Sequence, residues 1–234
     1  MDEYKRTTTP TCTGTSVFAT VYDGGVAICS DRKVSMYKMS RFRGVTRQYQ
    51  LNKYCVVAFS GDFADFQWLQ NILQQEEMRL RLTNPKFYMT PKAVHSYLSD
   101  LLYYRRSQLN PIWTQLLVGG MQPIDNDFSK MEPYIGVITP KGVSYTAKSV
   151  ATGMGAMLLN QLMETDVRAK DYKLSEDEAK KLLTKLIELS IYHDCEADNC
   201  FDISTIDTTN GVKRSNPMKI LGNWDLATYN NDYQ

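Results

Sequence analysis

Residues Thr13 to Asp31 read Thr-Gly-Thr-Ser-Val-Phe-Ala-Thr-Val-Tyr-Asp-Gly-Gly-Val-Ala-Ile-Cys-Ser-Asp, and this stretch decides the fold. Val17, Ala19 and Val21 alternate with the residues at 16, 18, 20 and 22, which predicts a strand covered on both faces by packed layers. The sequence at 23–25, Asp-Gly-Gly, predicts a tight turn because glycine accepts a positive φ. The return strand then ends at Asp31, close to where the first strand began.

Composition suits one large domain. The chain has 234 residues, of which 43% are hydrophobic, and no segment reaches the roughly 20 apolar residues that span a membrane. A formal charge of +1 gives no bulk electrostatic reason for binding nucleic acid or an anionic membrane surface. We therefore expect neither as a partner.

Five widely spaced cysteines, an odd number, and no hydrophobic signal segment after Met1 indicate a reducing compartment, the cytoplasm or the nucleus. His193, Cys195 and Cys200 lie near one another in the sequence. They lack a fourth ligand and a Cys-x-x-Cys spacing, which favours ordinary packing thiols over zinc. We expect no metal and no cofactor. A zinc-stabilised binding domain stays as an alternative that elemental analysis would test.

Apolar periodicity predicts the elements of the first half. Short strands are expected over 34–39 and 45–51, on either side of a basic turn at 40–44, and a buried strand over 53–60. A long helix is expected from Asp62 to Leu82 and a second from Thr90 to Arg106. Thr90 is the predicted N-cap of that second helix, and Pro91 its first helical residue.

The second half repeats this order. Strands are expected over 113–119, 134–138 and 143–145, with 122–133 as a surface loop. One helix is expected from 152–155 through Leu162, and another opens at the capping box Ser175–Glu178. A hairpin of 200–206 and 212–213 follows. Two stacked antiparallel sheets with a helix pair outside each would bury every apolar face, which predicts an α/β (α+β) fold, a four-layer α/β/β/α sandwich.

An N-terminal threonine can hydrolyse amides. Its hydroxyl attacks the carbonyl, its free α-amine takes the proton, and a nearby lysine and carboxylate tune both groups. The amine, with a pKa near ~8, is largely neutral at cellular pH. The question is whether Thr15, which follows Gly14, is such a nucleophile.

Three motifs carry a family resemblance. They are Gly14-Thr15, the Gly-Gly-Val-x-Ile-x-x-x-Asp that ends at Asp31, and Ser60-Gly61-Asp62-x-x-Asp65. Together they resemble the beta subunits of the proteasome, which are N-terminal-nucleophile hydrolases in fold, over essentially the whole chain. Further motifs narrow the resemblance to the beta type-4 class, which is structural rather than proteolytic: Thr-x-Thr-Pro from Thr7, Arg41-Phe42-Arg43, and the stretches 104–113, 151–156 and 223–227.

The resemblance implies a role for each matching position. Thr15 falls at the nucleophile, Asp31 and Asp194 at the two aspartates, and Gly61 at the glycine whose amide forms the oxyanion hole. We expect the aspartates to be kept for local hydrogen bonding and Gly61 for the turn from strand to helix.

Three positions depart from the pattern of active subunits. Arg47 replaces the essential lysine, Met154 a serine, and Ala197 the serine after the second aspartate. Arginine keeps its proton in proteins and is bulkier than lysine. A catalytic cluster whose residues act as a unit loses most of its activity when one of them is replaced. We therefore expect no catalytic residue and no enzyme activity from this chain alone. The alternative is an active N-terminal-threonine endopeptidase. We leave open whether Arg47 pairs with Asp31 or faces solvent.

The resemblance also divides the chain. We expect a leader over 1–14, a beta-type domain over 15–221 and a C-terminal arm over 222–234. Trimming is implied near Arg6 and Thr7. A leader left attached at Gly14 would leave Thr15 without a free amine and would fill the pocket.

The implied partners are neighbouring beta subunits, an alpha ring and the opposite beta ring. In a hetero-oligomer of 28 subunits, the resemblance assigns the opposite ring to the arm that carries Trp224, Tyr229 and Tyr233. Aromatic residues in a polar strip also suit docking onto another chain. Arg105 and Arg106 are expected at an interface with neighbours.

Overall fold

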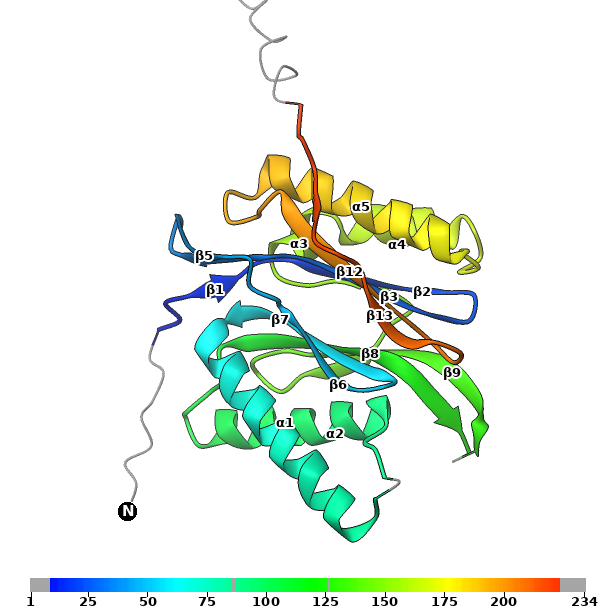
Figure 1. Cartoon of the computed structure of the whole chain (residues 1–234). Coiled ribbons are helices and arrows are strands. Elements are labelled where there is room, and N and C mark those ends of the chain that lie inside the picture. The colour runs from blue at the N-terminus through cyan, green and yellow to red at the C-terminus, as the bar shows by residue number, and fades with distance from the viewer. Residues whose placement is uncertain (1–8, 86, 126, 224–234) are drawn as a thin grey trace, which may run out of the picture.

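The computed structural model describes residues 9–85, 87–125 and 127–223, arranged in four layers (Figure 1). A six-stranded antiparallel sheet has the order β11-β2-β3-β12-β13, with β14 paired to β12. Its strands are β2 (Val17–Tyr22), β3 (Gly25–Asp31), β11 (Ser149–Ala151), β12 (Cys200–Asp207), β13 (Gly211–Arg214) and β14 (Met218–Lys219).

The second sheet has eight strands in the order β10-β9-β8-β7-β1-β4-β5, with β6 paired to β7. The strands are β1 (Thr13–Gly14), β4 (Lys33–Met36), β5 (Met39–Arg43), β6 (Gln48–Asn52), β7 (Cys55–Asp62), β8 (Thr114–Ile124), β9 (Asp127–Ile138) and β10 (Ser144–Thr146). All pairings in both sheets are antiparallel. The four-layer prediction is confirmed.

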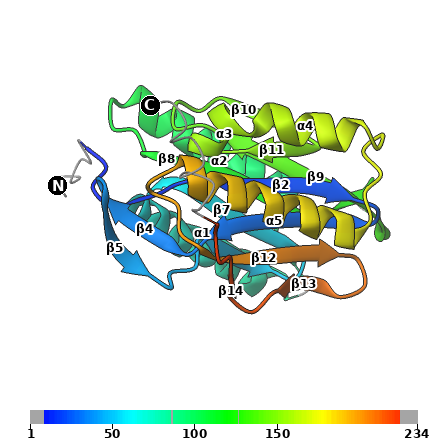
Figure 2. The ribbon, with the colours of Figure 1, turned by 90° about the horizontal axis from the view of Figure 1, so that it is seen from above.

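Helices cover the outer face of each sheet, as Figures 1 and 2 show. They are α1 (Phe63–Thr83), α2 (Pro91–Ser107), α3 (Met154–Leu158), α4 (Asn160–Arg168) and α5 (Glu176–His193). The predicted start signals are present: Thr90 caps α2 ahead of Pro91, and Ser175 and Glu178 form a reciprocal capping box on α5. Each such cap satisfies backbone N–H groups that the first helical turn leaves without partners.

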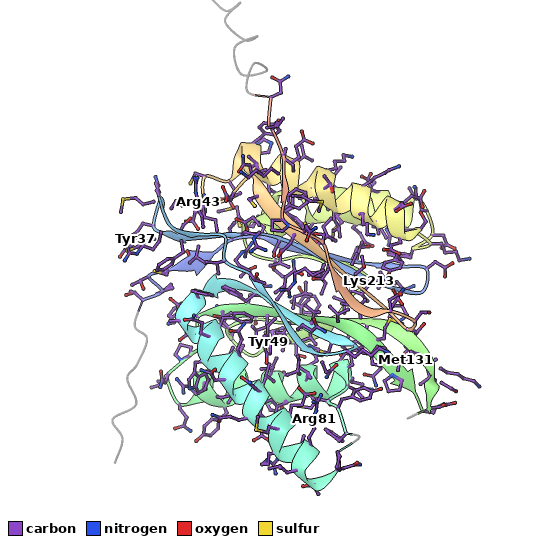
Figure 3. The ribbon with its side chains drawn as sticks, viewed as in Figure 1. Tyr37, Arg43, Tyr49, Arg81, Met131 and Lys213 are labelled. Atoms are coloured by element: carbon purple, nitrogen blue, oxygen red, sulfur yellow. The ribbon has the colours of Figure 1, made fainter. Side chains whose placement is uncertain are left out.

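The opening hairpin lies between the layers as its alternation predicts. Val17 and Ala19 of β2 belong to the core between the two sheets, whereas Phe18 packs into the core beneath α4 and α5. Gly24 supplies the positive φ of the turn. A third core lies between the eight-stranded sheet and α1 and α2, and side chains fill all three spaces (Figure 3).

Three sequence predictions are wrong. The expected loop at 122–133 is the tip of a β8–β9 hairpin, whose register pairs Gln122 with Glu132. Backbone hydrogen bonds between the strands hold the tip of this hairpin, and its side chains are mostly exposed. The sequence therefore shows no apolar alternation there. The basic turn at 40–44 is strand β5; the chain turns earlier, at Tyr37, a non-glycine residue with φ 53°. The single helix after 152 is two helices with a break at Leu159.

Candidate functional site

Thr15 lies between β1 and β2, where the chain crosses from one sheet to the other, and it borders a pocket of about 350 Å³. The pocket brings Gly61, Met154 and Asp194 to the same place as Thr15. These four predicted positions, far apart in the sequence, therefore meet in the fold. Asp31 and Arg47 lie buried behind them.

Arg47 is fully buried and precedes β6. Its Nε donates to the Asp31 carbonyl at 3.1 Å. Nη1 donates to the carbonyls of Thr15 at 2.9 Å and Phe59 at 3.0 Å. Nη2 donates to the Ser16 carbonyl at 2.6 Å and to the Asp31 carboxylate. A guanidinium has five N–H donors, so every donor of Arg47 is used.

These contacts join the two sheets. Phe59 belongs to β7 in one sheet and Asp31 to β3 in the other. Of the two orientations that the sequence left open for Arg47, the structure shows the buried pair with Asp31. A buried charge is tolerated only when it is paired and hydrogen-bonded, and the five acceptors meet that condition.

Asp31 is held from two sides. Oδ1 accepts from Arg47, and Oδ2 accepts from the Asp198 backbone N–H at 3.2 Å. Burial raises the pKa of the Asp31 carboxyl to about 6, against the opposing pull of the Arg47 guanidinium. Asp31 thus serves the local network of hydrogen bonds.

Asp194 holds the hydroxyl of Thr15. Thr15 Oγ1 donates to Asp194 Oδ2, and Asp194 Oδ1 accepts from the Glu196 backbone N–H at 2.8 Å. Ala197, in the same turn, offers its carbonyl to Lys33 Nζ at 2.8 Å. The methyl side chain of Ala197 brings no hydroxyl to this cluster.

Gly61 occupies a backbone conformation that only glycine adopts easily. Its φ is 119°, and a Cβ there would lie 2.4 Å from the Trp113 carbonyl oxygen. The backbone itself therefore requires a glycine here, one residue before the end of β7 and the start of α1. Met154 begins α3 on the other side of the pocket and is half-exposed.

The residues before Thr15 are built into the eight-stranded sheet. β1 pairs Thr13 with Asp62 and Gly14 with Gly61. The Cys12 carbonyl accepts from the Phe63 N–H at 2.8 Å. The chain leading to Thr15 thus continues as a hydrogen-bonded strand rather than as a free end.

Gly14 is a site residue that the sequence did not single out for packing. A Cβ on Gly14 would lie 2.6 Å from Arg47 Cδ. Lys33 was missed as well; it is buried, and its Nζ reaches the turn of Cys195 and Ala197. Its position at the start of a short strand, Lys-Val-Ser-Met, directly after Asp31-Arg32, gives no clear signal that it is buried.

The other predicted positions do not join this site. Arg6, Thr7, Trp224, Tyr229 and Tyr233 lie outside the described residues. Arg105 and Arg106 lie in the last turn of α2. Among residues 9–85, 87–125 and 127–223, no group of three His, Cys, Asp or Glu side chains gathers as a metal site. In the same ranges, no helix is long and apolar enough to cross a membrane.

Known proteins match the chain over nearly its full length. A family model described as proteasome subunit matches residues 11–206. Proteasome subunit beta type-4 of Xenopus laevis is 34% identical over 223 residues, 95% of this chain and 88% of that protein. The Arabidopsis thaliana protein of the same name is 30% identical over 98% of this chain and 89% of its own length.

A relative from the yeast Saccharomyces cerevisiae carries a different subunit type in its name. This protein, proteasome subunit beta type-7, is 30% identical over 93% of this chain and 82% of its own length. The family model spans the Thr15 site and the strands from β1 into β12. The chain belongs to the proteasome subunit family, as a beta-type member.

Proposed function

We propose that the chain is a non-catalytic, structural beta subunit of the 20S proteasome core particle. It forms part of the wall of a threonine-type endopeptidase particle and makes contacts between its subunits, while the active sites lie on other chains. The particle acts in ATP- and ubiquitin-dependent protein degradation. The observation that carries the proposal is Arg47, whose five donors are all taken by the Thr15, Ser16, Asp31 and Phe59 acceptors.

The chemistry of the Thr15 site supports this reading. Catalysis by an N-terminal threonine needs a free amine and a basic group beside the hydroxyl. Here Thr15 carries Gly14 on its nitrogen, its hydroxyl donates to Asp194, and the guanidinium that replaces the lysine cannot accept a proton. The active endopeptidase, the alternative from the sequence, is not favoured.

The arrangement in the assembly is part of the proposal. The subunit occupies one place in a seven-membered beta ring between an alpha ring and a second beta ring, in the cytoplasm and nucleus. Residues 1–14 act as leader, 15–221 as the ring domain and 222–234 as an arm toward the opposite ring. Trimming of the leader near Arg6 and Thr7 would keep Gly14 attached.

Core particles assembled with Thr15→Ala in place of the unchanged chain test the proposal. Peptidase activities measured on substrates of each specificity class should stay within about twofold of the unaltered particle, because Thr15 performs no chemistry. Native mass spectrometry of the same sample establishes that the variant is incorporated. Loss of one class of activity from fully assembled particles would show that Thr15 is a nucleophile.

A further inference from the structure

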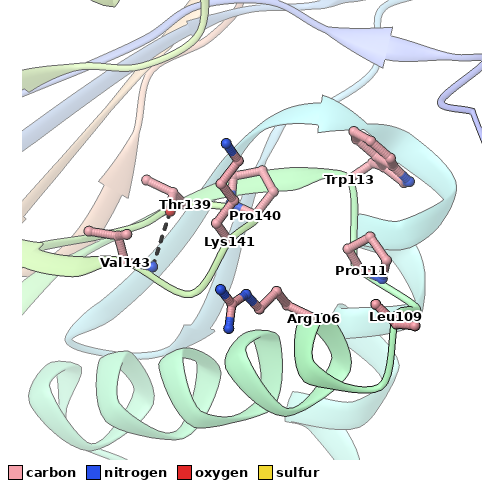
Figure 4. Close-up of a pocket in the computed structure, with 8 residues that line it drawn as sticks. All are labelled: Arg106, Leu109, Pro111, Trp113, Thr139, Pro140, Lys141 and Val143. Carbon is pink, nitrogen blue, oxygen red and sulfur yellow. Dashed lines mark hydrogen bonds between the residues drawn. The ribbon is translucent and has the colours of Figure 1, made fainter.

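We propose that a groove at the end of α2 binds a segment of a neighbouring subunit that carries a large apolar side chain next to a carboxylate. The groove is about 880 Å³ and lies between the 106–113 segment and the β9–β10 turn at 139–143 (Figure 4). We call it the α2 groove. The proposal rests on the proposed function and adds the chemistry of one partner contact.

The walls of the α2 groove are fixed by hydrogen bonds. On one side, the N–H groups of Leu109 and Asn110 donate to the carbonyls of Arg106 and Arg105, both at 3.1 Å. On the other, the Thr139 N–H donates to the Val143 carbonyl at 2.9 Å, and Thr139 Oγ1 accepts from the Val143 N–H at 3.1 Å. A preformed groove binds with little loss of conformational entropy.

The lining is apolar and open to water in the isolated chain. Leu109 is 72% exposed and Val143 58% exposed, and Trp113, Pro111 and Pro140 complete the apolar part of the lining. Leu109 also has a φ of 56°, a conformation that costs energy for a residue with a Cβ. The volume lies within the range of about 300–1,000 Å³ typical of binding clefts. A contiguous apolar hollow of this kind marks an interaction site.

Charge selects the occupant. Arg106 and Lys141 are the charged residues of the lining, and it holds no carboxylate. Within the described part of the chain, neither cation forms an ion pair. The Arg106 guanidinium lies over the Tyr103 ring at 5.4 Å. Arg105, by contrast, is occupied by the Asn110 carbonyl and the Trp68 ring.

An apolar floor with two cations at its rim complements a segment in which a carboxylate flanks a large apolar residue. We assign the groove to a neighbouring subunit, because a subunit that stays in the particle would keep the exposed side chains of Leu109 and Val143 out of water. The groove shares Trp113 and Pro140 with the Thr15 pocket. A substrate peptide that reaches the Thr15 pocket is therefore the rival occupant, which the test must distinguish from a neighbouring subunit.

Photo-crosslinking in assembled core particles tests the proposal. A benzoylphenylalanine replaces Val143, an exposed residue of the turn, and a matched probe replaces Leu82 at the end of α1, which is 83% exposed. After irradiation without added substrate, mass spectrometry should identify one dominant crosslink from position 143 to a peptide of a different subunit. That peptide should hold Asp or Glu beside a large apolar residue.

Charge reversal provides the second arm. The double variant Arg106→Glu/Lys141→Glu should enter particles at least about tenfold less well than the unchanged chain when the two compete. The control Lys92→Glu, on an exposed surface of α2, should compete equally. Circular dichroism of the isolated variants checks that folding is unchanged.

Each outcome decides. A crosslink to a second copy of this chain, to an added substrate peptide only, or to a segment without a carboxylate overturns the groove proposal. So does equal competition by the charge-reversed variant. In those cases, a chain that still enters the particle leaves the proposed function standing. Failure of the unchanged chain to enter core particles would instead overturn the proposed function, and the groove proposal with it.

Discussion

Arg47 and Asp31 form a buried ion pair that ties the eight-stranded sheet to the six-stranded sheet beside Thr15. The side chain of Arg47 is fully buried, and that of Asp31 nearly so. Arg47 stands at the position where active subunits of the family have a lysine. Its role in this chain follows from its contacts: it holds backbone carbonyls in place, and it offers no free donor to the pocket.

Arg47→Met should destabilise the isolated chain by about 3–5 kcal/mol, because it leaves the Asp31 carboxylate buried without its partner. Arg47→Met/Asp31→Asn should recover part of the loss, since no lone charge then remains buried. Unfolding in urea measures both free energies. The matched control is Arg79→Met: Arg79 pairs with Glu76 at 2.8 Å, but Arg79 is exposed and Glu76 is only partly buried. This change should cost less than about 1 kcal/mol. Equal effects at 47 and 79 would refute a structural role for the buried pair.

The fold was largely predictable where a buried face requires apolar residues at regular spacing in the sequence. The β2–β3 hairpin, β7, α2 and α5 were found because their apolar alternation, turns and caps are local signals. The β8–β9 tip and β5 were missed because their residues are exposed, and pairing of the backbone alone makes them strands. The turn at Tyr37 uses a positive φ without glycine, so no turn signal marks it.

The site was predictable as a set of positions but not as a network. Resemblance brought Thr15, Asp31, Arg47 and Asp194 together. The sequence could not decide between a paired and a solvent-facing Arg47, because that depends on four carbonyls from three separate segments. The fit of Gly14 against the Arg47 side chain has the same origin. Long-range packing of this kind has no local signature.

His95 should make the fold sensitive to acid. It is buried in α2; its Nε2 lies 3.2 Å from the Val137 carbonyl, and its Nδ1 2.7 Å from the Tyr134 hydroxyl. Burial lowers the pKa of the His95 imidazole. Below pH ~6.5 the unfolded chain therefore binds a proton that the folded chain resists, and the free energy of unfolding falls.

Replacing His95 by Gln removes this term. The difference in unfolding free energy between the unchanged chain and His95→Gln should shrink as pH falls from 7 to 5. Taking the difference cancels the opposite contribution of Asp31, whose pKa is raised to about 6 and whose native state gains stability as pH falls through that value. His193→Gln, at the exposed end of α5, is the control. A difference that is constant across this range would count against a buried neutral His95.

The arm provides a prediction about assembly. Removing residues 223–234 should lower the yield of full core particles and leave half-particles, because the truncation takes away three aromatic anchors, Trp224, Tyr229 and Tyr233. Native gel electrophoresis with native mass spectrometry measures the ratio. A second variant keeps the full length of the arm but has alanine at the three aromatic positions. It distinguishes the effect of losing the aromatic side chains from the effect of shortening the chain. Normal yields from both variants would remove the arm from ring joining.

Chemical labelling decides whether Thr15 is a nucleophile. Purified core particles are treated with a threonine-directed epoxyketone, and the mass and N-terminal sequence of this chain are then determined. We expect an N-terminus that precedes Gly14 and no epoxyketone adduct on this chain, while catalytic subunits of the same particle are labelled. A chain that begins at Thr15 and carries the adduct would show instead that Thr15 is a nucleophile.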